Sequence, residues 1–142
     1  MNEMLGLENQ YTFLEYRKSQ EKKHMGAIDK NDPLATILSV EVNTTEMCNR
    51  KCSFCPRHDP KVFANRNLHM SPWGAEIIAS KLSEAFRGRV SLSGFGENLL
   101  NPRFPSIVHA LRKHLPDNVI ECNTNGDKLS KDYVKKLFDN GL

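Results

Sequence analysis

Apolar residues follow two different spacings between residues 37 and 139, and the two spacings alternate along the chain. Short runs with an apolar residue at every second position predict strands, and longer runs with apolar residues three or four positions apart predict helices. The expected strands are 37–43, 90–93 and 119–123. The expected helices are 72–87, 104–115 and 131–139. Because strand and helix alternate strictly, the pattern predicts an α/β fold with a parallel sheet.

Capping and breaking residues mark the ends of the first expected helix. Ser71-Pro72 is a typical helix start, and Gly88 is a typical stop. Its apolar positions recur at helical spacing and are expected to face the core. These positions are Trp73, Ile77, Ile78, Leu82, Ala85 and Phe86.

Each expected strand has one apolar and one polar face. In the first strand Leu38, Val40 and Val42 share a face that can pack against helices. The polar residues of the opposite faces are Ser39, Glu41, Asn43, Ser91, Ser93, Glu121 and Asn123. A barrel interior is normally filled with branched apolar side chains, so a polar inner face suggests a wetted or ligand-filled cavity. A register shifted by one residue would exchange the two faces.

Residues 1–33 differ from the rest and are expected to form a helical, charged N-terminal extension to a domain at 34–142. Leu7, Tyr11 and Leu14 have helical spacing, and a charged run follows them. The 142 residues are 39% hydrophobic with a formal net charge of +3, which is ordinary for a globular domain. This charge does not indicate nucleic-acid or membrane binding. No signal peptide or membrane-spanning segment is recognised, so a cytoplasmic protein with reduced thiols is expected.

Three of the four cysteines lie within eight residues, directly after the first expected strand: Cys48, Cys52 and Cys55. In a reducing compartment such a group indicates a metal site rather than disulfides. Three thiolates can hold three irons of a cubane iron–sulfur cluster and leave the fourth iron open. A structural zinc site is the alternative, and it would need a fourth ligand such as Cys122. The strand pattern turns Cys122 toward the helices, so we interpret it as a buried structural cysteine.

Two further segments follow the second and third expected strands, at the same edge of the sheet. Gly94-Phe95-Gly96-Glu97 contains two glycines that permit close approach of the backbone to a ligand. Asn123-Thr124-Asn125-Gly126 follows the third strand, although Asn-Gly is also a common turn. His58 and His69 flank the segment after the cysteines and are expected to lie in a solvated loop.

The C-x3-C-x2-C spacing of Cys48, Cys52 and Cys55 resembles the signature of the radical S-adenosylmethionine (radical SAM) superfamily. The two later segments resemble that family's motifs in the same order, so the resemblance covers residues 37–142. It implies a partial (β/α)6 TIM-like barrel, of which about three strand–helix units, the N-terminal half, are present. It also implies that a 4Fe–4S cluster on the three cysteines cleaves S-adenosylmethionine (SAM) reductively. The product is a 5′-deoxyadenosyl radical that abstracts hydrogen from a substrate.

The resemblance further implies which residues contact SAM. Phe54 would lie against the adenine, and Asn123 would line the cofactor cavity. The segment at the methionine amino group would be Gly94, Phe95, Gly96 and Glu97. Phe95 stands where the family has a glycine, and Asn98 stands where some members have a proline.

Partners and completeness are also implied by the resemblance. An electron donor such as flavodoxin or ferredoxin is expected, and the substrate is not specified by the sequence. The sequence ends where a fourth strand is expected, so we interpret it as a fragment truncated at the C-terminus. A natural half-barrel that dimerises or docks on a partner is the alternative. The rival to an enzyme is a small zinc- or iron–sulfur-binding module without catalysis.

Overall fold

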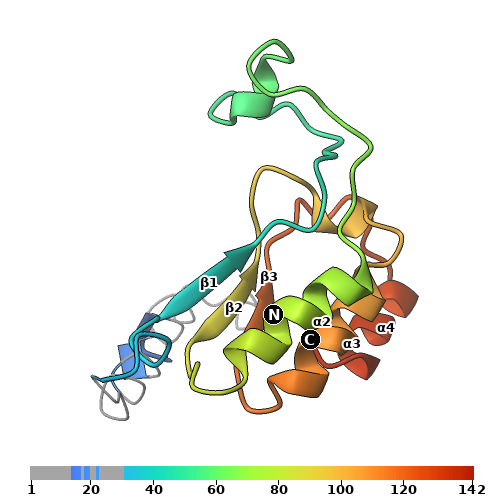
Figure 1. Ribbon diagram of the computed structural model, residues 1–142. Coiled ribbons are helices and arrows are strands. Elements are labelled where there is room, and N and C mark those ends of the chain that lie inside the picture. The colour runs from blue at the N-terminus through green and yellow to red at the C-terminus, as the bar shows by residue number, and fades with distance from the viewer. Residues whose placement is uncertain (1–13, 17, 20–21, 23–30) are drawn as a thin grey trace, which may run out of the picture.

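The computed structural model describes residues 14–16, 18–19, 22 and 31–142 (Figure 1). The strands are β1 (Ser39–Val42), β2 (Arg89–Leu92) and β3 (Ile120–Cys122). The α-helices are α2 (Pro72–Leu82), α3 (Phe104–His114) and α4 (Lys131–Asp139). Two short 3-10 helices, η1 (Pro56–His58) and η2 (Asn98–Leu100), lie in loops. The order of strands and α-helices is the one that the sequence pattern predicts.

The three strands form one parallel sheet in the order β1-β2-β3. Val40 pairs with Val90, and Val90 pairs in turn with Ile120. Since all strands point the same way, the segments that follow them start at one edge of the sheet. The predicted α/β fold with a parallel sheet is therefore confirmed.

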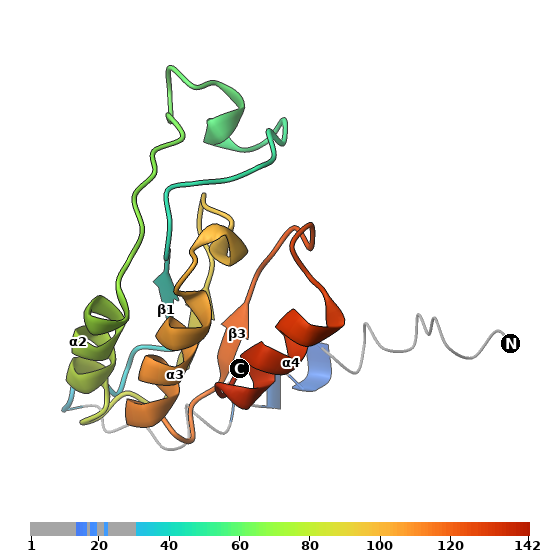
Figure 2. The same cartoon turned by 90° about the vertical axis from the view of Figure 1, so that its right-hand side faces the viewer.

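The α-helices cover one face of the sheet, and the core lies between the two layers (Figure 2). The strands contribute apolar side chains to this core: Val42, Val90, Leu92 and Ile120. Helix α3 opposes them with Phe104, Ile107 and Leu111, each of them fully buried. These strand residues belong to the faces predicted to be apolar, so the predicted register of the strands is correct.

Helix α2 is shorter than predicted, and only part of its predicted apolar face meets the core. It ends at Leu82 rather than at residue 87, and a side-chain to main-chain hydrogen bond follows, from Ser83 Oγ to the Ser80 carbonyl (2.8 Å). Two residues predicted to face the core are exposed, Trp73 by 71% and Ile77 by 40%. The predicted positions Leu82 and Phe86 are buried, and the small residues Ala75 and Ala79 complete the buried face. Small side chains let one helix pack closely against its neighbour, which the count of large apolar residues did not reveal.

The N-terminal extension predicted at 1–33 lies mostly outside the described residues, including Leu7 and Tyr11. Residues 14–16, 18–19 and 22 are helical, and Leu14 is about half exposed. Among the described helices, none combines the length and the apolar character that crossing a membrane requires.

The orientation of α2 can be tested with two truncations of similar size on the same helix. We expect Leu82→Ala to lower the free energy of unfolding by about 2–4 kcal/mol, because it opens a cavity in the core. Ile77→Ala should cost less than about 1 kcal/mol, because its side chain is partly in water. Urea denaturation measures both. Equal losses would mean that Ile77 packs in the core together with Leu82, as the sequence pattern predicts.

Candidate functional site

Three loops leave the carboxyl ends of the strands on the same side of the sheet (Figure 1). The first loop, 43–71, is the longest, carries the three neighbouring cysteines and rises above the sheet. The second loop, 93–103, follows β2, and the third loop, 123–130, follows β3. Loops at this edge of parallel strands form the active sites of α/β proteins, so their mutual contacts define the candidate site.

Asn98 joins the bases of all three loops from a fully buried position. Its Oδ1 accepts a hydrogen bond from Thr44 Oγ1 in the first loop (2.7 Å). Its Nδ2 donates to the carbonyl of Leu92 at the end of β2 (2.7 Å) and to the carbonyl of Asn123 in the third loop (3.3 Å). A buried amide whose donors and acceptor are all engaged fixes the relative positions of its partners.

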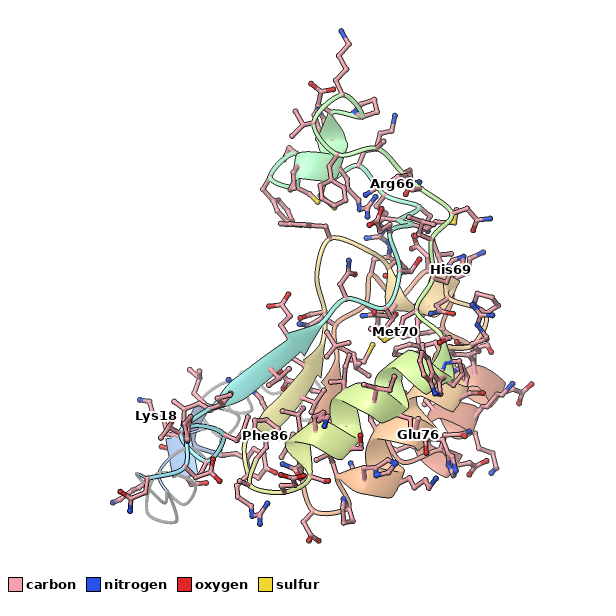
Figure 3. The ribbon with its side chains drawn as sticks, viewed as in Figure 1. Lys18, Arg66, His69, Met70, Glu76 and Phe86 are labelled. Carbon is pink, nitrogen blue, oxygen red and sulfur yellow. The ribbon has the colours of Figure 1, made fainter. Side chains whose placement is uncertain are left out.

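Asn101 closes the stem of the first loop in the same way. It is fully buried, and its Nδ2 donates to the carbonyls of Thr44 (2.9 Å) and Met70 (3.0 Å). Met70 N donates to the same Thr44 carbonyl (2.9 Å), so the two ends of the loop are held side by side. Figure 3 shows Arg66, His69 and Met70 in succession along the segment that descends from the tip of this loop to α2.

His69 is not the solvated residue that the sequence suggested. Its Nδ1 lies 2.8 Å from Thr45 Oγ1, and its Nε2 lies 2.7 Å from Asn67 Oδ1. Both ring nitrogens are therefore occupied within the first loop. His58 is exposed, as predicted, with Nδ1 3.3 Å from the carbonyl of Lys51.

Cys48, Cys52 and Cys55 are free thiols, each partly buried. A turn holds two of them, because Cys55 N donates to the Cys52 carbonyl (3.0 Å). Asn65 holds the third from across the loop: its Oδ1 accepts from Cys48 N (2.8 Å) and its Nδ2 donates to the Cys48 carbonyl (2.9 Å). In the part of the chain that is described, no three Cys, His, Asp or Glu side chains converge closely enough to hold a metal ion. Hydrogen bonds thus hold the main chain of the loop in place. The three thiol groups lie on the same loop but do not converge on one position.

Arg57 is the buried charge of this loop. It lies two residues after Cys55 and is 5% exposed. Its Nε donates to the Phe95 carbonyl in the second loop, and its Nη1 reaches the carbonyl of Ala64 (3.3 Å) and Asn65 Oδ1 (3.2 Å). Its Nη2 is buried without a hydrogen-bond partner. Three soft sulfur donors on one loop, with an unsatisfied cationic donor on the same loop, are a donor set that fits an anionic iron–sulfur cluster.

The two glycines of the second loop have a structural requirement of their own. Gly94 has φ +131°, and a Cβ there would lie 2.9 Å from the side chain of Asn43. A Cβ at Gly96 would collide with the carbonyl oxygen of Thr45. Both glycines thus let the second loop pass directly against the first, a requirement that exists whether or not a ligand also approaches them.

Glu97 binds the third loop through its side chain. It is 3% exposed, its Oε1 accepts from Thr124 Oγ1 (2.8 Å) and its Oε2 accepts from Asn125 N (2.8 Å). Oε1 also accepts from Leu99 N (3.0 Å) at the start of η2. Through its main chain, Glu97 N donates to the Met47 carbonyl next to Cys48 (2.7 Å). One residue therefore connects the second loop to both others.

An exposed network joins the cysteine segment to the third loop. Arg50 forms an ion pair with Asp127 and donates from Nε to Asp127 Oδ2 (2.9 Å). Asn49 Nδ2 donates to the same oxygen (2.8 Å), and Asn125 Nδ2 donates to Asn49 Oδ1 (2.9 Å). The hydrogen bond from Arg50 is the largest cause of a lowered pKa at Asp127, and the same pair raises the pKa of Arg50.

The remaining predicted site residues lie at the rims of the loops. Phe54 is 90% exposed and Phe95 is 50% exposed. The side chain of Asn123 is exposed, while its main chain pairs with Leu92 through Asn123 N (3.0 Å). Cys122 packs against the core, as its predicted face requires. Burial, assisted by the negative charge of Glu97, raises the pKa of Cys122 to about 12, so its thiol is a poor candidate for a thiolate ligand.

Three residues that organise this site were not predicted as site residues: Arg57, Asn98 and Asn101. In the sequence, Asn98 is marked only by standing where some family members have a proline. The available signal was the pair of asparagines directly after the glycine segment, since asparagine can bridge main-chain groups of neighbouring loops. For Arg57 the signal was a charged residue immediately after Cys55-Pro56, but charged residues in loops are usually solvated.

The role of Asn98 can be tested with an isosteric change. Asn98→Asp replaces the donor that serves Leu92 and Asn123 with an oxygen, so two carbonyls each lose one hydrogen bond in a buried site, and the new carboxylate faces them. We expect the free energy of unfolding to fall by about 2–4 kcal/mol. Asn123→Asp is the matched control with an exposed side chain and should change it by about 0.5 kcal/mol or less. If urea denaturation gave similar losses of unfolding free energy for the two variants, Asn98 would not be the residue that holds the three loops together.

The Arg50–Asp127 pair predicts a pH effect with a definite sign. Because the pKa of Asp127 is lowered in the folded protein, its contribution to stability is present above the ordinary aspartate pKa of about 3.9 and is lost as pH falls through the lower folded value. NMR titration of the Asp127 carboxyl carbon should show this low value. Arg50→Gln should move it back toward the ordinary value, and Arg87→Gln should not. No movement in Arg50→Gln would contradict the pairing.

Comparisons with known proteins agree on one family. The model of the Radical SAM superfamily matches residues 42–142. The chain is 30% identical over 112 residues to the S-adenosyl-L-methionine-dependent 2-deoxy-scyllo-inosamine dehydrogenase of Niallia circulans, covering 78% of this chain and 43% of that protein. It is 29% identical over 115 residues to the GTP 3',8-cyclase of Mesorhizobium japonicum, covering 78% and 34%.

A solved structure has the same fold. The crystal structure of BtrN in complex with AdoMet and 2-DOIA superposes with a TM-score of 0.68 and 27% sequence identity, over 75% of this chain and 44% of that chain. The chain spans less than half the length of each of these proteins. Since the family model matches most of the sequence, from residue 42 to residue 142, the chain belongs to the radical SAM superfamily.

Proposed function

We propose that residues 34–142 form the N-terminal half of a partial (β/α)6 barrel in a radical SAM enzyme, preceded by a helical, charged extension at 1–33. The parallel order β1-β2-β3 with helices on one face supports this, because such units close into a barrel when more of them follow. The polar strand face would then line the cofactor cavity. Its residues include Ser91 and Ser93, whose hydroxyls lie 3.3 Å apart.

The single observation that carries the proposal is the position of the cysteine triplet. Cys48, Cys52 and Cys55 lie on the first loop, above the carboxyl edge of the sheet, and that loop is bonded to both neighbouring loops. Their three thiolates would hold a 4Fe–4S cluster and leave one iron open for SAM. When bound, the cluster and SAM supply reductive cleavage to methionine and a 5′-deoxyadenosyl radical, which abstracts hydrogen from a substrate.

The other two loops would bind and orient SAM. The second loop, at Gly94, Phe95, Gly96 and Glu97, would hold the methionine amino group. The carboxylate of Glu97 is already bonded to Thr124 and Asn125, so we assign its contribution to the fixed position of its main chain. Phe54, 90% exposed, would be covered by the adenine, and Asn123 would contact the cofactor from the third loop. Covering exposed aromatic surface would also exclude water from the reaction.

Partners follow from the same chemistry. The cluster needs a one-electron donor, for which flavodoxin or ferredoxin is suitable, and both the donor and the reduced thiols fit a cytoplasmic protein. The dehydrogenase and the cyclase that this chain resembles act on different compounds, as their names state. The substrate is therefore left open, and the proposal is confined to hydrogen abstraction.

The test is anaerobic reconstitution of the full chain with iron and sulfide, followed by analysis of iron, sulfide and zinc. We expect a brown protein with four irons and four sulfides per chain, as in a cubane cluster. Cys48→Ala, Cys52→Ala and Cys55→Ala should each lose the cluster, because each removes one of three ligands. Cys122→Ala is the matched control and should retain it.

Catalysis is measured separately, as release of 5′-deoxyadenosine from SAM under dithionite. Zinc in place of iron would support the zinc module. A cluster without 5′-deoxyadenosine would support a cluster-binding module without catalysis. Retention of the cluster in the three cysteine variants would refute the ligand assignment.

A further inference from the structure

Arg57 is a buried cation whose hydrogen-bond partners are all uncharged. It is 5% exposed, and it donates to the carbonyls of Phe95 and Ala64 and to the amide oxygen of Asn65. None of these partners is a carboxylate. A charge removed from water is costly unless an opposite charge lies nearby, so a counter-charge is expected within reach.

One nitrogen of the Arg57 side chain also lacks a hydrogen-bond acceptor. Nη2 is buried without a hydrogen-bond partner, and it is the one side-chain nitrogen or oxygen in this condition among the residues described. The neighbours of Arg57 include aromatic rings. Its guanidinium lies 4.5 Å from the centre of the Phe63 ring, and Phe63 meets Phe95 edge-on with ring centres 5.5 Å apart. These rings limit access of water to the guanidinium, so water does not readily replace the missing acceptor.

The position of Arg57 connects it to two parts of the cysteine segment. It follows Cys55 by two residues, and it bonds Asn65, which in turn holds both main-chain groups of Cys48. A lysine would keep the positive charge at this site. It could not donate hydrogen bonds to Phe95, Ala64 and Asn65 together, because it lacks the planar guanidinium group. Arg57 is thus connected to the main-chain segments that carry Cys48 and Cys55.

We propose that Arg57 is the counter-ion of the cluster, and that its Nη2 donates a hydrogen bond to a cluster or cysteine sulfur. This rests on the proposed function, because it requires the cluster on Cys48, Cys52 and Cys55. A cubane cluster with three thiolates is anionic, and one electron from a reductant makes it more negative. A buried positive charge and a hydrogen bond to sulfur both favour the reduced form and raise the reduction potential. Arg57 therefore acts on the cluster directly and tunes its reduction potential.

The first experiment detects the contact in the unmodified chain. The full chain is labelled with nitrogen-15 arginine, reconstituted, reduced with dithionite and examined by pulsed electron–nuclear double resonance. We expect a nitrogen-15 coupling to the reduced cluster that is lost in Arg57→Lys and retained in Arg50→Lys and Arg66→Lys. Absence of the coupling in the unmodified chain, or its loss in Arg50→Lys, overturns the proposed contact without any need for an Arg57 variant.

The second experiment measures midpoint potentials by redox titration. Arg57→Gln should lower the potential, and Arg57→Lys should lie closer to the unmodified chain because it keeps the charge. Arg66→Gln is the matched control on the same loop, since Arg66 is exposed and pairs with Glu46. It should leave the potential unchanged. Arg57→Gln with a normal iron content and an unchanged potential overturns the inference, because a purely structural arginine would give that result.

Failure of the two proposals can be told apart. If the unmodified chain takes up no iron and sulfide, the cluster assignment fails, and the inference fails with it. If the unmodified chain is loaded but shows neither the nitrogen coupling nor the shift in potential, only the role of Arg57 fails. Should Arg57→Gln lose its cluster, the double-resonance result on the unmodified chain and on Arg50→Lys decides the question.

Discussion

The buried side chain of Asn98 is the contact on which the geometry of the site depends. Parallel strands end with main-chain groups that the sheet no longer pairs, and the loops that follow are free to diverge. Asn98 donates to the Leu92 carbonyl at the end of β2, which Asn123 N also reaches, and to the Asn123 carbonyl beyond β3, and it accepts from Thr44 beyond β1. Since the amide is buried, a loop that moved away would leave an unsatisfied polar group behind. The three loops therefore hold one arrangement.

The hydrogen bonds of Asn98 also bring the loops into close contact. The second loop lies so near the first that Gly96 has no room for a Cβ beside the Thr45 carbonyl. At this distance Glu97 N reaches the Met47 carbonyl, next to Cys48, while its carboxylate reaches the third loop. The glycine segment thus has two requirements at once: it must fit against the cysteine loop, and in the proposed function it must also fit SAM. The segment that the sequence assigns to a ligand is already needed by the fold.

The sequence was sufficient for the features that depend on local periodicity. It predicted three strands, three helices, the parallel sheet and the face of each strand that meets the core, because these follow from spacing alone. Only part of the predicted face of α2 was right, because Ala75 and Ala79 are buried by the approach of α3, and their own hydrophobicity does not reveal this. Contacts between residues far apart in sequence could not be predicted for the same reason. The hydrogen-bond partners of Asn98 and Arg57 lie in other loops, which meet only in the folded chain.

The two kinds of polar contact in the loops have different consequences for binding. Asn98 and Asn101 are neutral and satisfied at the base of the loops, so they need no ligand and support the loops at any ordinary pH. Arg57, higher in the first loop, is charged and incompletely satisfied. The free energy cost of that burial falls if an anion binds beside it, and any group that binds the folded loop more tightly than the unfolded loop stabilises it. In the proposed cluster site, loading and ordering of the cysteine segment would therefore be linked. The three thiols, which do not yet converge, would be brought together by the same event that neutralises Arg57.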